Sequence, residues 1–104
     1  CAFGTVHGVY LKAPKLDFAR LETIRSRVNV PLVMHGGSGV SEADYQKSIK
    51  CGIRKINYYT YMAKAGADAV AGKTYSLYHD LIADATAAME QDVQRAIEIF
   101  QMDK

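Results

Sequence analysis

Two histidines in this sequence are each followed by a glycine and preceded by a short apolar segment. His7 comes just after the small, apolar residues 1–5, and His35 follows Leu32-Val33-Met34. Neutral imidazole is the commonest metal ligand in proteins, and a catalytic zinc takes three protein ligands while one position stays open. If the two segments are neighbouring strands, both imidazoles can reach one metal ion. A hydrogen-bonded structural histidine is the alternative for either residue.

A glycine-rich segment, Gly36-Gly37-Ser38-Gly39, follows His35 directly. Glycines allow backbone N–H groups to approach an anion closely, and the Ser38 hydroxyl adds a further donor. The helix expected to begin at Ser41 directs its positive end toward the same place. These features indicate a phosphate site, and an ordinary strand-to-helix turn is the alternative.

A third polar group, Asn57-Tyr58-Tyr59-Thr60, stands at the end of another predicted strand. Its amide, backbone and hydroxyl groups suit a substrate hydroxyl or a phosphate oxygen, although an asparagine there can also be a plain turn residue. His79 is different, because it lies near the start of the last predicted helix with no partner in the sequence. We expect His79 to be exposed or structural.

The elements that must position these residues alternate along the chain. Apolar segments predict strands over 1–5, 32–34 and 53–57, and helical periodicity predicts helices beginning after Asp17 and at Ser41 and spanning about 61–71 and 77–101. Strands that alternate with helices indicate an α/β fold with a parallel sheet and right-handed crossovers. The carboxyl ends of such strands carry the functional site, most of all in βα barrels. A barrel needs eight units, so this chain would supply three.

Composition excludes several classes of function. The chain has 104 residues, of which 49% are hydrophobic and 23% charged, which is typical of a folded globular protein. A net charge of +2 without a basic run argues against a nucleic-acid partner, and no apolar run approaches the ~20 residues that cross a bilayer. The two cysteines, Cys1 and Cys51, lack zinc-type spacing and cannot form a disulfide framework. We therefore expect a cytoplasmic protein.

Three motifs resemble class II ketose-bisphosphate aldolases, the metal-dependent fructose- and tagatose-bisphosphate aldolase type. Residues 4–10 are similar to the family signature G-T-x-H-G-x-Y, and the likeness continues through Pro14-Lys15-Leu16-Asp17-Phe18. Residues 31–40, Pro-Leu-Val-Met-His-Gly-Gly-Ser-Gly-Val, and residues 55–60, Lys-Ile-Asn-Tyr-Tyr-Thr, follow in the family's order and spacing. The resemblance covers residues 1 to about 60 without gaps, and the last helix fits more loosely.

The resemblance implies that residues 1–104 form the C-terminal part of one aldolase domain, namely the last three βα units of a TIM (β/α)₈ barrel. It also implies a zinc ion held by three histidines, of which His7 and His35 are two. The third histidine and the acid/base aspartate belong to an earlier strand of the family, so no catalytic residue is expected in this chain. The substrate site implied by the family comprises Gly8, Gly36, Gly37, Ser38, Asn57, Tyr58, Tyr59 and Thr60.

The function implied is a zinc-dependent lyase of cytoplasmic carbohydrate metabolism, as in glycolysis. It would cleave or form a ketose bisphosphate, with dihydroxyacetone phosphate as the enediolate partner and an aldehyde as the other substrate. A monovalent cation and a homodimer or homotetramer are further expectations, and the 104 residues alone should be inactive. The alternative is a non-catalytic phosphate-binding barrel that diverged from the aldolases.

Two departures from the family pattern concern the substrate. Many members have a lysine directly after the tyrosine that matches Tyr10, whereas this chain has Leu11 there and Lys12 one position later. Fructose-type members tend to have aspartate, and tagatose-type members alanine, where this chain has Tyr59. The rest of the C-terminal match is closer to the tagatose type. The stereochemistry of the sugar therefore stays open.

Overall fold

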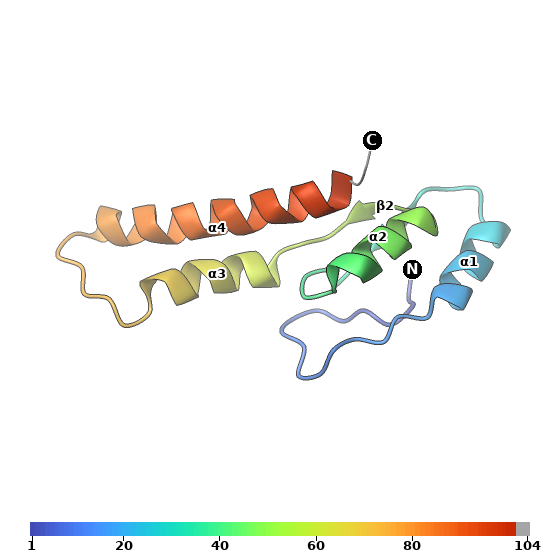
Figure 1. The fold of residues 1–104 in the computed structure, drawn as a ribbon, viewed down its shortest axis with the longest axis horizontal. Helices are drawn as coiled ribbons and strands as arrows, with labels where there is room; N and C mark the ends of the chain where they lie inside the picture. Colours follow the sequence, from blue (N-terminus) through green and yellow to red (C-terminus); the bar gives the residue numbers. More distant parts are fainter. Residues whose placement is uncertain (102–104) are drawn as a thin grey trace.

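The computed structural model describes residues 1–101, which form an α/β arrangement of four helices and two strands. The elements follow the order α1 (Phe18–Arg27), β1 (Leu32–Met34), α2 (Glu42–Lys50), β2 (Ile53–Ile56), α3 (Thr60–Val70) and α4 (Tyr78–Gln101) (Figure 1). Helices α1 and α2 lie with the strands at one end of the molecule, whereas α3 and α4 extend away from them. The predicted α/β class is therefore confirmed.

The two strands pair in parallel, with Leu32 opposite Ile53 and Met34 opposite Ile56. Parallel strands need a crossover connection, which α2 supplies here. The buried core gathers around this pair and consists of Phe3, Leu16, Leu21, Leu32, Met34, Val40, Tyr45 and Ile53. Because parallel strands end at the same edge of a sheet, the residues after Met34 and after Ile56 emerge side by side.

The predicted helix starts are confirmed by their caps. The Asp17 carboxylate accepts a hydrogen bond from the Arg20 N–H at 2.9 Å, and the Ser41 hydroxyl accepts one from the Asp44 N–H at 3.2 Å. Each cap satisfies an N–H group that the first turn of a helix leaves without an intrahelical partner. Both caps follow directly from local sequence.

The strand predicted over residues 1–5 is wrong. The segment lies beside β1, since the Cys1 amino group donates to the Val33 carbonyl at 2.9 Å, but it does not continue as a strand. Gly4 has a φ of +122°, far from the extended region that a strand requires. The Phe3 carbonyl accepts from the Asp17 N–H at 2.7 Å, so the backbone turns toward the start of α1. Residues 1–101 therefore contain two of the three predicted strands.

Helices α3 and α4 form an antiparallel hairpin (Figure 1). Gly66 of α3 is buried where the helices meet, and a Cβ atom there would lie 2.9 Å from both Cγ and Sδ of Met89. A larger residue at position 66 would therefore push the two helices apart. Both helices match their predicted ranges to within one residue.

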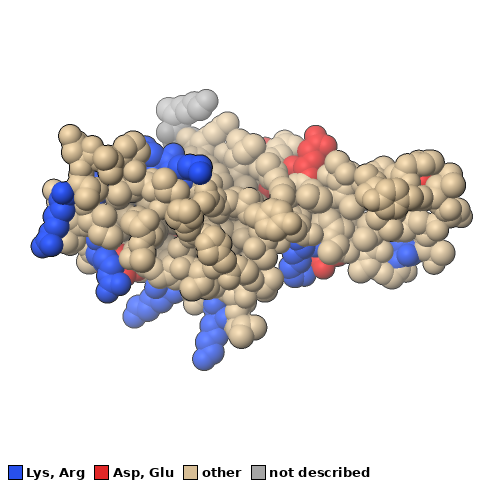
Figure 2. Space-filling model, turned by 180° about the vertical axis from the view of Figure 1, so that it is seen from behind, with Lys and Arg blue, Asp and Glu red and all other residues tan. Residues whose placement is uncertain are grey.

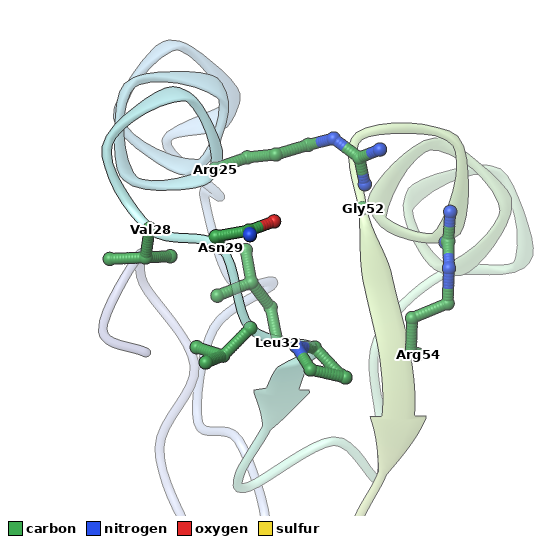
Figure 3. A pocket seen from close by; sticks show the side chains of 8 residues that line it. Arg25, Val28, Asn29, Leu32, Gly52 and Arg54 are labelled. Carbon is green, nitrogen blue, oxygen red and sulfur yellow. The ribbon is translucent and has the colours of Figure 1, made fainter.

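A hollow of about 330 Å³ lies at the amino ends of the strands, opposite the end where polar residues were predicted to gather (Figure 3). Arg25 reaches across it from α1 to Gly52, the residue directly before β2. Gly52 has a φ of +117°, and a Cβ atom there would lie 2.6 Å from Cδ of Arg25. The backbone conformation favours glycine, whereas the exposed Arg25 side chain could move to admit a Cβ.

Charge is divided unevenly along the chain. Residues 1–56 carry nine Lys and Arg against four Asp and Glu, whereas residues 57–101 carry three against six. On the face in Figure 2 the basic side chains gather over the end that holds α1 and α2. This end attracts anions more strongly than the α3–α4 end does. Within residues 1–101, none of the helices has the length and apolar character needed to cross a bilayer.

Candidate functional site

A cavity of about 360 Å³ opens at the carboxyl ends of the two strands. Its walls come from three chain segments: the one that ends at His7, the turn after β1 and the segment that joins β2 to α3. Its lining residues are His7, Gly36, Gly37, Ser38, Ile56, Asn57, Tyr58, Tyr59 and Thr60. Seven of the eight residues predicted to bind substrate are in this set, and Gly8 is not.

The two predicted metal ligands lie next to each other at this cavity. The ring centroids of His7 and His35 are 6.2 Å apart, and both side chains are exposed. Two imidazoles bound to one tetrahedral zinc at ~2.1 Å have ring centroids roughly 5 Å apart. The observed separation is close to that value, so His7 and His35 are near enough to hold one metal ion together.

A third ligand must come from elsewhere. No group of three or more His, Cys, Asp or Glu residues within residues 1–101 is arranged to hold a metal ion. The remaining histidine of the sequence, His79, lies on α4 and is exposed, with Nε2 3.2 Å from a carboxylate oxygen of Asp80. A metal ion held by His7 and His35 would therefore need a further ligand from outside residues 1–101.

His35 is held by Asn57. The Asn57 side-chain amide lies 3.0 Å from Nδ1 of His35, so the first residue of the Asn57–Thr60 segment contacts a predicted metal ligand. An amide offers both a donor and an acceptor, and it can therefore satisfy Nδ1 in either tautomer. Such partners orient a ligating imidazole and leave Nε2 directed at the metal. Asn57 was expected at the substrate or as a plain turn residue, and its contact with His35 was not expected.

The segment that carries His7 is tied to the one that carries His35. The Thr5 hydroxyl donates to the His35 carbonyl at 2.6 Å. The Tyr10 hydroxyl accepts from the Val6 N–H at 3.2 Å and donates to the Gly36 carbonyl at 2.8 Å. These bonds replace the missing strand ladder at residues 1–5, and they keep the two imidazoles adjacent.

The glycine turn fits tightly against its neighbours. The Gly37 N–H donates to the Asn57 carbonyl at 3.1 Å, and the Asn57 N–H donates to the Met34 carbonyl at 2.9 Å. A Cβ atom at Gly37 would lie 2.6 Å from Cγ2 of Ile56. At Gly36, which has a φ of +60°, it would lie 3.0 Å from the His7 backbone nitrogen. The two glycines let the turn pack closely against both flanking segments.

Tyr58 and Tyr59 differ in what they offer to the cavity. The Tyr58 hydroxyl donates to the Asp92 carboxylate on α4 at 2.6 Å, and its ring packs edge-on against Phe100. Burial, followed by the hydrogen bond to Asp92, raises the pKa of Tyr58 far above its usual value. Tyr58 therefore lines the cavity while its hydroxyl anchors α4. Tyr59 is 68% exposed, and Thr60 is the first residue of α3.

Several residues at this site were not among the predicted site residues, including Thr5, Tyr45 and Asp92. Tyr45, in the first turns of α2, is 4% exposed and donates from its hydroxyl to the Gly37 carbonyl. Its position four residues after the helix cap Ser41 is the signal that could have found it, because such a residue faces the turn that precedes the helix. Asp92 is 34 residues from Tyr58, and no local pattern connects them.

This chain is similar in sequence and fold to known proteins. Residues 1–104 match the family described as fructose-bisphosphate aldolase class-II. The YdjI aldolase from Escherichia coli K12 is 36% identical and superposes with a TM-score of 0.83 over 95% of this chain. A candidate fructose-1,6-biphosphate aldolase from Coccidioides immitis is 30% identical, with a TM-score of 0.87 over 96% of this chain.

A fructose-bisphosphate aldolase from Campylobacter jejuni is 20% identical with a TM-score of 0.68, which shows a shared fold. This chain spans 38%, 36% and 38% of the lengths of these three proteins, in the order given. It corresponds to a little over one third of each. The match over all 104 residues, together with two structures at 30% identity or more, shows that the chain belongs to the class II fructose-bisphosphate aldolase family.

Proposed function

We propose that these residues are the C-terminal part of a zinc-dependent class II aldolase, and that they form the last three βα units of its (β/α)₈ barrel. The whole protein would cleave or form a ketose bisphosphate, with dihydroxyacetone phosphate as one partner and an aldehyde as the other. Family membership also supports a homo-oligomeric protein of cytoplasmic carbohydrate metabolism.

The observation that carries this proposal is the meeting of two adjacent imidazoles with a glycine turn at one cavity. The rings of His7 and His35 lie 6.2 Å apart, and the cavity between the strand ends is lined by Gly36, Gly37 and Ser38. A metal ion and a phosphate would therefore be bound side by side. An aldolase of this class requires that juxtaposition, since its substrate is itself a phosphorylated ketone.

His7 and His35 would hold the zinc ion, together with a ligand from outside residues 1–104. Zinc bound there supplies a Lewis acid that stabilises negative charge on the ketone oxygen of the substrate. Asn57 keeps the His35 ring in place through its contact with Nδ1. No lysine is needed to form a Schiff base, and none lines the cavity among the described residues.

The phosphate would be bound by the glycine turn and by the start of α3. Ser38 and Thr60 line the cavity and carry hydroxyl groups, and α3 begins at Thr60. Backbone N–H groups and a helix N-terminus both favour an anion. Holding the phosphate fixes the distance between the reacting carbon and the metal, which is how positioning accelerates a reaction. The excess of basic residues in 1–56 would attract doubly charged substrates.

Tyr59 would influence the choice of sugar. Its ring is 68% exposed at the cavity, at the position that separates fructose-type from tagatose-type members. A bulky aromatic side chain there narrows the space for the aldehyde partner. We therefore propose the reaction class without assigning the stereochemistry of the substrate.

The test uses the full-length protein, purified with its metal. Condensation of dihydroxyacetone phosphate with a panel of aldehydes should require zinc and stop when a chelator removes it. His35→Ala should abolish both zinc retention and turnover, while His79→Ala, which alters an exposed histidine on α4, should change neither. A protein that binds phosphate but retains no zinc and gives no condensation would instead be a non-catalytic phosphate-binding barrel.

A further inference from the structure

Two tyrosine hydroxyls donate to successive carbonyl groups of the glycine turn. The Tyr10 hydroxyl donates to the Gly36 carbonyl at 2.8 Å, and the Tyr45 hydroxyl donates to the Gly37 carbonyl. Tyr45 is 4% exposed, and its ring packs edge-on against Phe100 with centroids 4.9 Å apart. The Tyr45 hydroxyl is thus fixed from α2 and α4 rather than free to follow the turn.

These bonds determine the direction of the N–H groups in the turn. No peptide bond in residues 1–101 is cis, so each carbonyl points opposite to the N–H of the same peptide. In the Gly36–Gly37 peptide the carbonyl meets Tyr10, and the N–H is already occupied by the Asn57 carbonyl at 3.1 Å. The Gly37 N–H is therefore not available to an anion.

The next peptide differs in this respect. In the Gly37–Ser38 peptide the carbonyl meets Tyr45, which directs the Ser38 N–H away from Tyr45. Ser38 lines the proposed phosphate cavity, and Tyr45 is not among the residues that line it. Tyr45 lines a neighbouring hollow with Val40, and Tyr58 lines both. The Ser38 N–H, which points away from the Tyr45 hydroxyl, can therefore face the cavity.

We propose that Tyr45 is a positioning residue for phosphate binding: its hydroxyl fixes the Gly37–Ser38 peptide so that the Ser38 N–H is directed at the phosphate. The inference rests on the proposed function, because it assigns a phosphate to this cavity. Tyr10 fixes the preceding peptide in the same manner. Burial raises the pKa of Tyr45 to about 12, so its hydroxyl keeps its proton and donates throughout the neutral range.

A purely structural role for Tyr45 predicts a different result. If the tyrosine only packs α2 against α4, removing its hydroxyl leaves the ring contact with Phe100 and should not alter phosphate affinity. If it positions the turn, the Gly37 carbonyl loses its donor, the peptide can rotate, and the phosphate loses a fixed N–H. Affinity for phosphate should then fall while the chemical step at saturation stays the same.

The substitution Tyr45→Phe in the full-length protein separates the structural role from the positioning role. We expect the Kd for inorganic phosphate and the KM for the ketose bisphosphate to rise together by roughly tenfold, equivalent to about 1.4 kcal/mol. The kcat and zinc content should stay near their starting values. Tyr75→Phe is the matched control, because it removes a hydroxyl that donates to Asp84 at 2.7 Å, far from the cavity, and it should change none of these quantities.

An unchanged Kd for inorganic phosphate in folded Tyr45→Phe overturns the inference, as does wild-type protein that binds no phosphate. Because phosphate binding is measured without turnover, weaker binding in Tyr45→Phe supports the positioning role even if the protein proves not to be an aldolase. If Tyr45→Phe does not fold, the amide resonance of Ser38 is followed by NMR in the wild-type protein as inorganic phosphate is added. A Ser38 amide resonance that does not shift on phosphate binding would then count as a refutation.

Discussion

Replacing Asn57 by alanine tests how the candidate metal site is held in place. The side-chain amide lies 3.0 Å from Nδ1 of His35, and alanine removes it. The backbone bonds of residue 57, to the Met34 carbonyl and from the Gly37 N–H, do not depend on the side chain and should persist. The substitution therefore removes one contact to a metal ligand and leaves the turn in place.

The expected magnitude follows from the role of such partners. Losing the group that orients a ligating imidazole lowers metal affinity by about 10- to 100-fold, which corresponds to about 1.4–2.7 kcal/mol. We expect the Kd for zinc of the full-length Asn57→Ala protein to rise by that factor, measured by competition with a chromophoric chelator. Asn57→Asp should keep zinc affinity near the wild-type value, because a carboxylate can accept a hydrogen bond from Nδ1–H.

The matched control is Asn29→Ala. Asn29 is exposed and lines the hollow at the amino ends of the strands, opposite the candidate site (Figure 3). The zinc affinity of Asn29→Ala should equal that of the wild-type protein. If Asn57→Ala binds zinc as tightly as wild type, or if both alanine variants lose affinity equally, the contact between Asn57 and His35 does not orient a metal ligand.

Three further outcomes follow from the same structure. Gly37→Ala should lower the free energy of unfolding by about 1–3 kcal/mol in urea titrations, because a Cβ would lie 2.6 Å from Cγ2 of Ile56; an unchanged midpoint would mean that the turn is loosely packed. Burial raises the pKa of Tyr45 from 10 to about 12, so the hydroxyl ionises more readily in the unfolded chain than in the folded one. The contribution of Tyr45 to the free energy of unfolding is therefore complete below pH 10 and is lost as the pH rises through 12. Denaturant unfolding across that range should therefore show a steeper decline in wild type than in Tyr45→Phe, and equal slopes would contradict it. Residues 1–104 alone should give no aldolase turnover in a coupled assay, since they hold two of three metal ligands, and measurable zinc-dependent turnover would refute this.

Local patterns were sufficient to predict the helices and the carboxyl-end location of the site. Asp17 and Ser41 cap α1 and α2 as their spacing indicated, because capping depends on residues within one turn. The rule that parallel strands end at one edge correctly placed His35 beside Asn57. It also placed His7 beside them, although the segment before His7 is not a strand.

Contacts between distant parts of the chain were not predictable in the same way. Gly4 looks like a small residue in an apolar strand, yet its positive φ and the bond from Asp17 to the Phe3 carbonyl end the ladder there. Tyr58 was expected at the substrate, and its hydroxyl donates to Asp92, which only the return of α4 brings near. Sequence periodicity shows which face of a helix is apolar, and it does not show which polar group that face will meet.

The most direct test of the account is an anomalous difference map at the zinc absorption edge, from crystals of the full-length protein. We predict one zinc peak within ~2.1 Å of a ring nitrogen of both His7 and His35, with the third protein ligand from outside residues 1–104. A zinc peak that neither of these two histidines contacts would contradict the central claim.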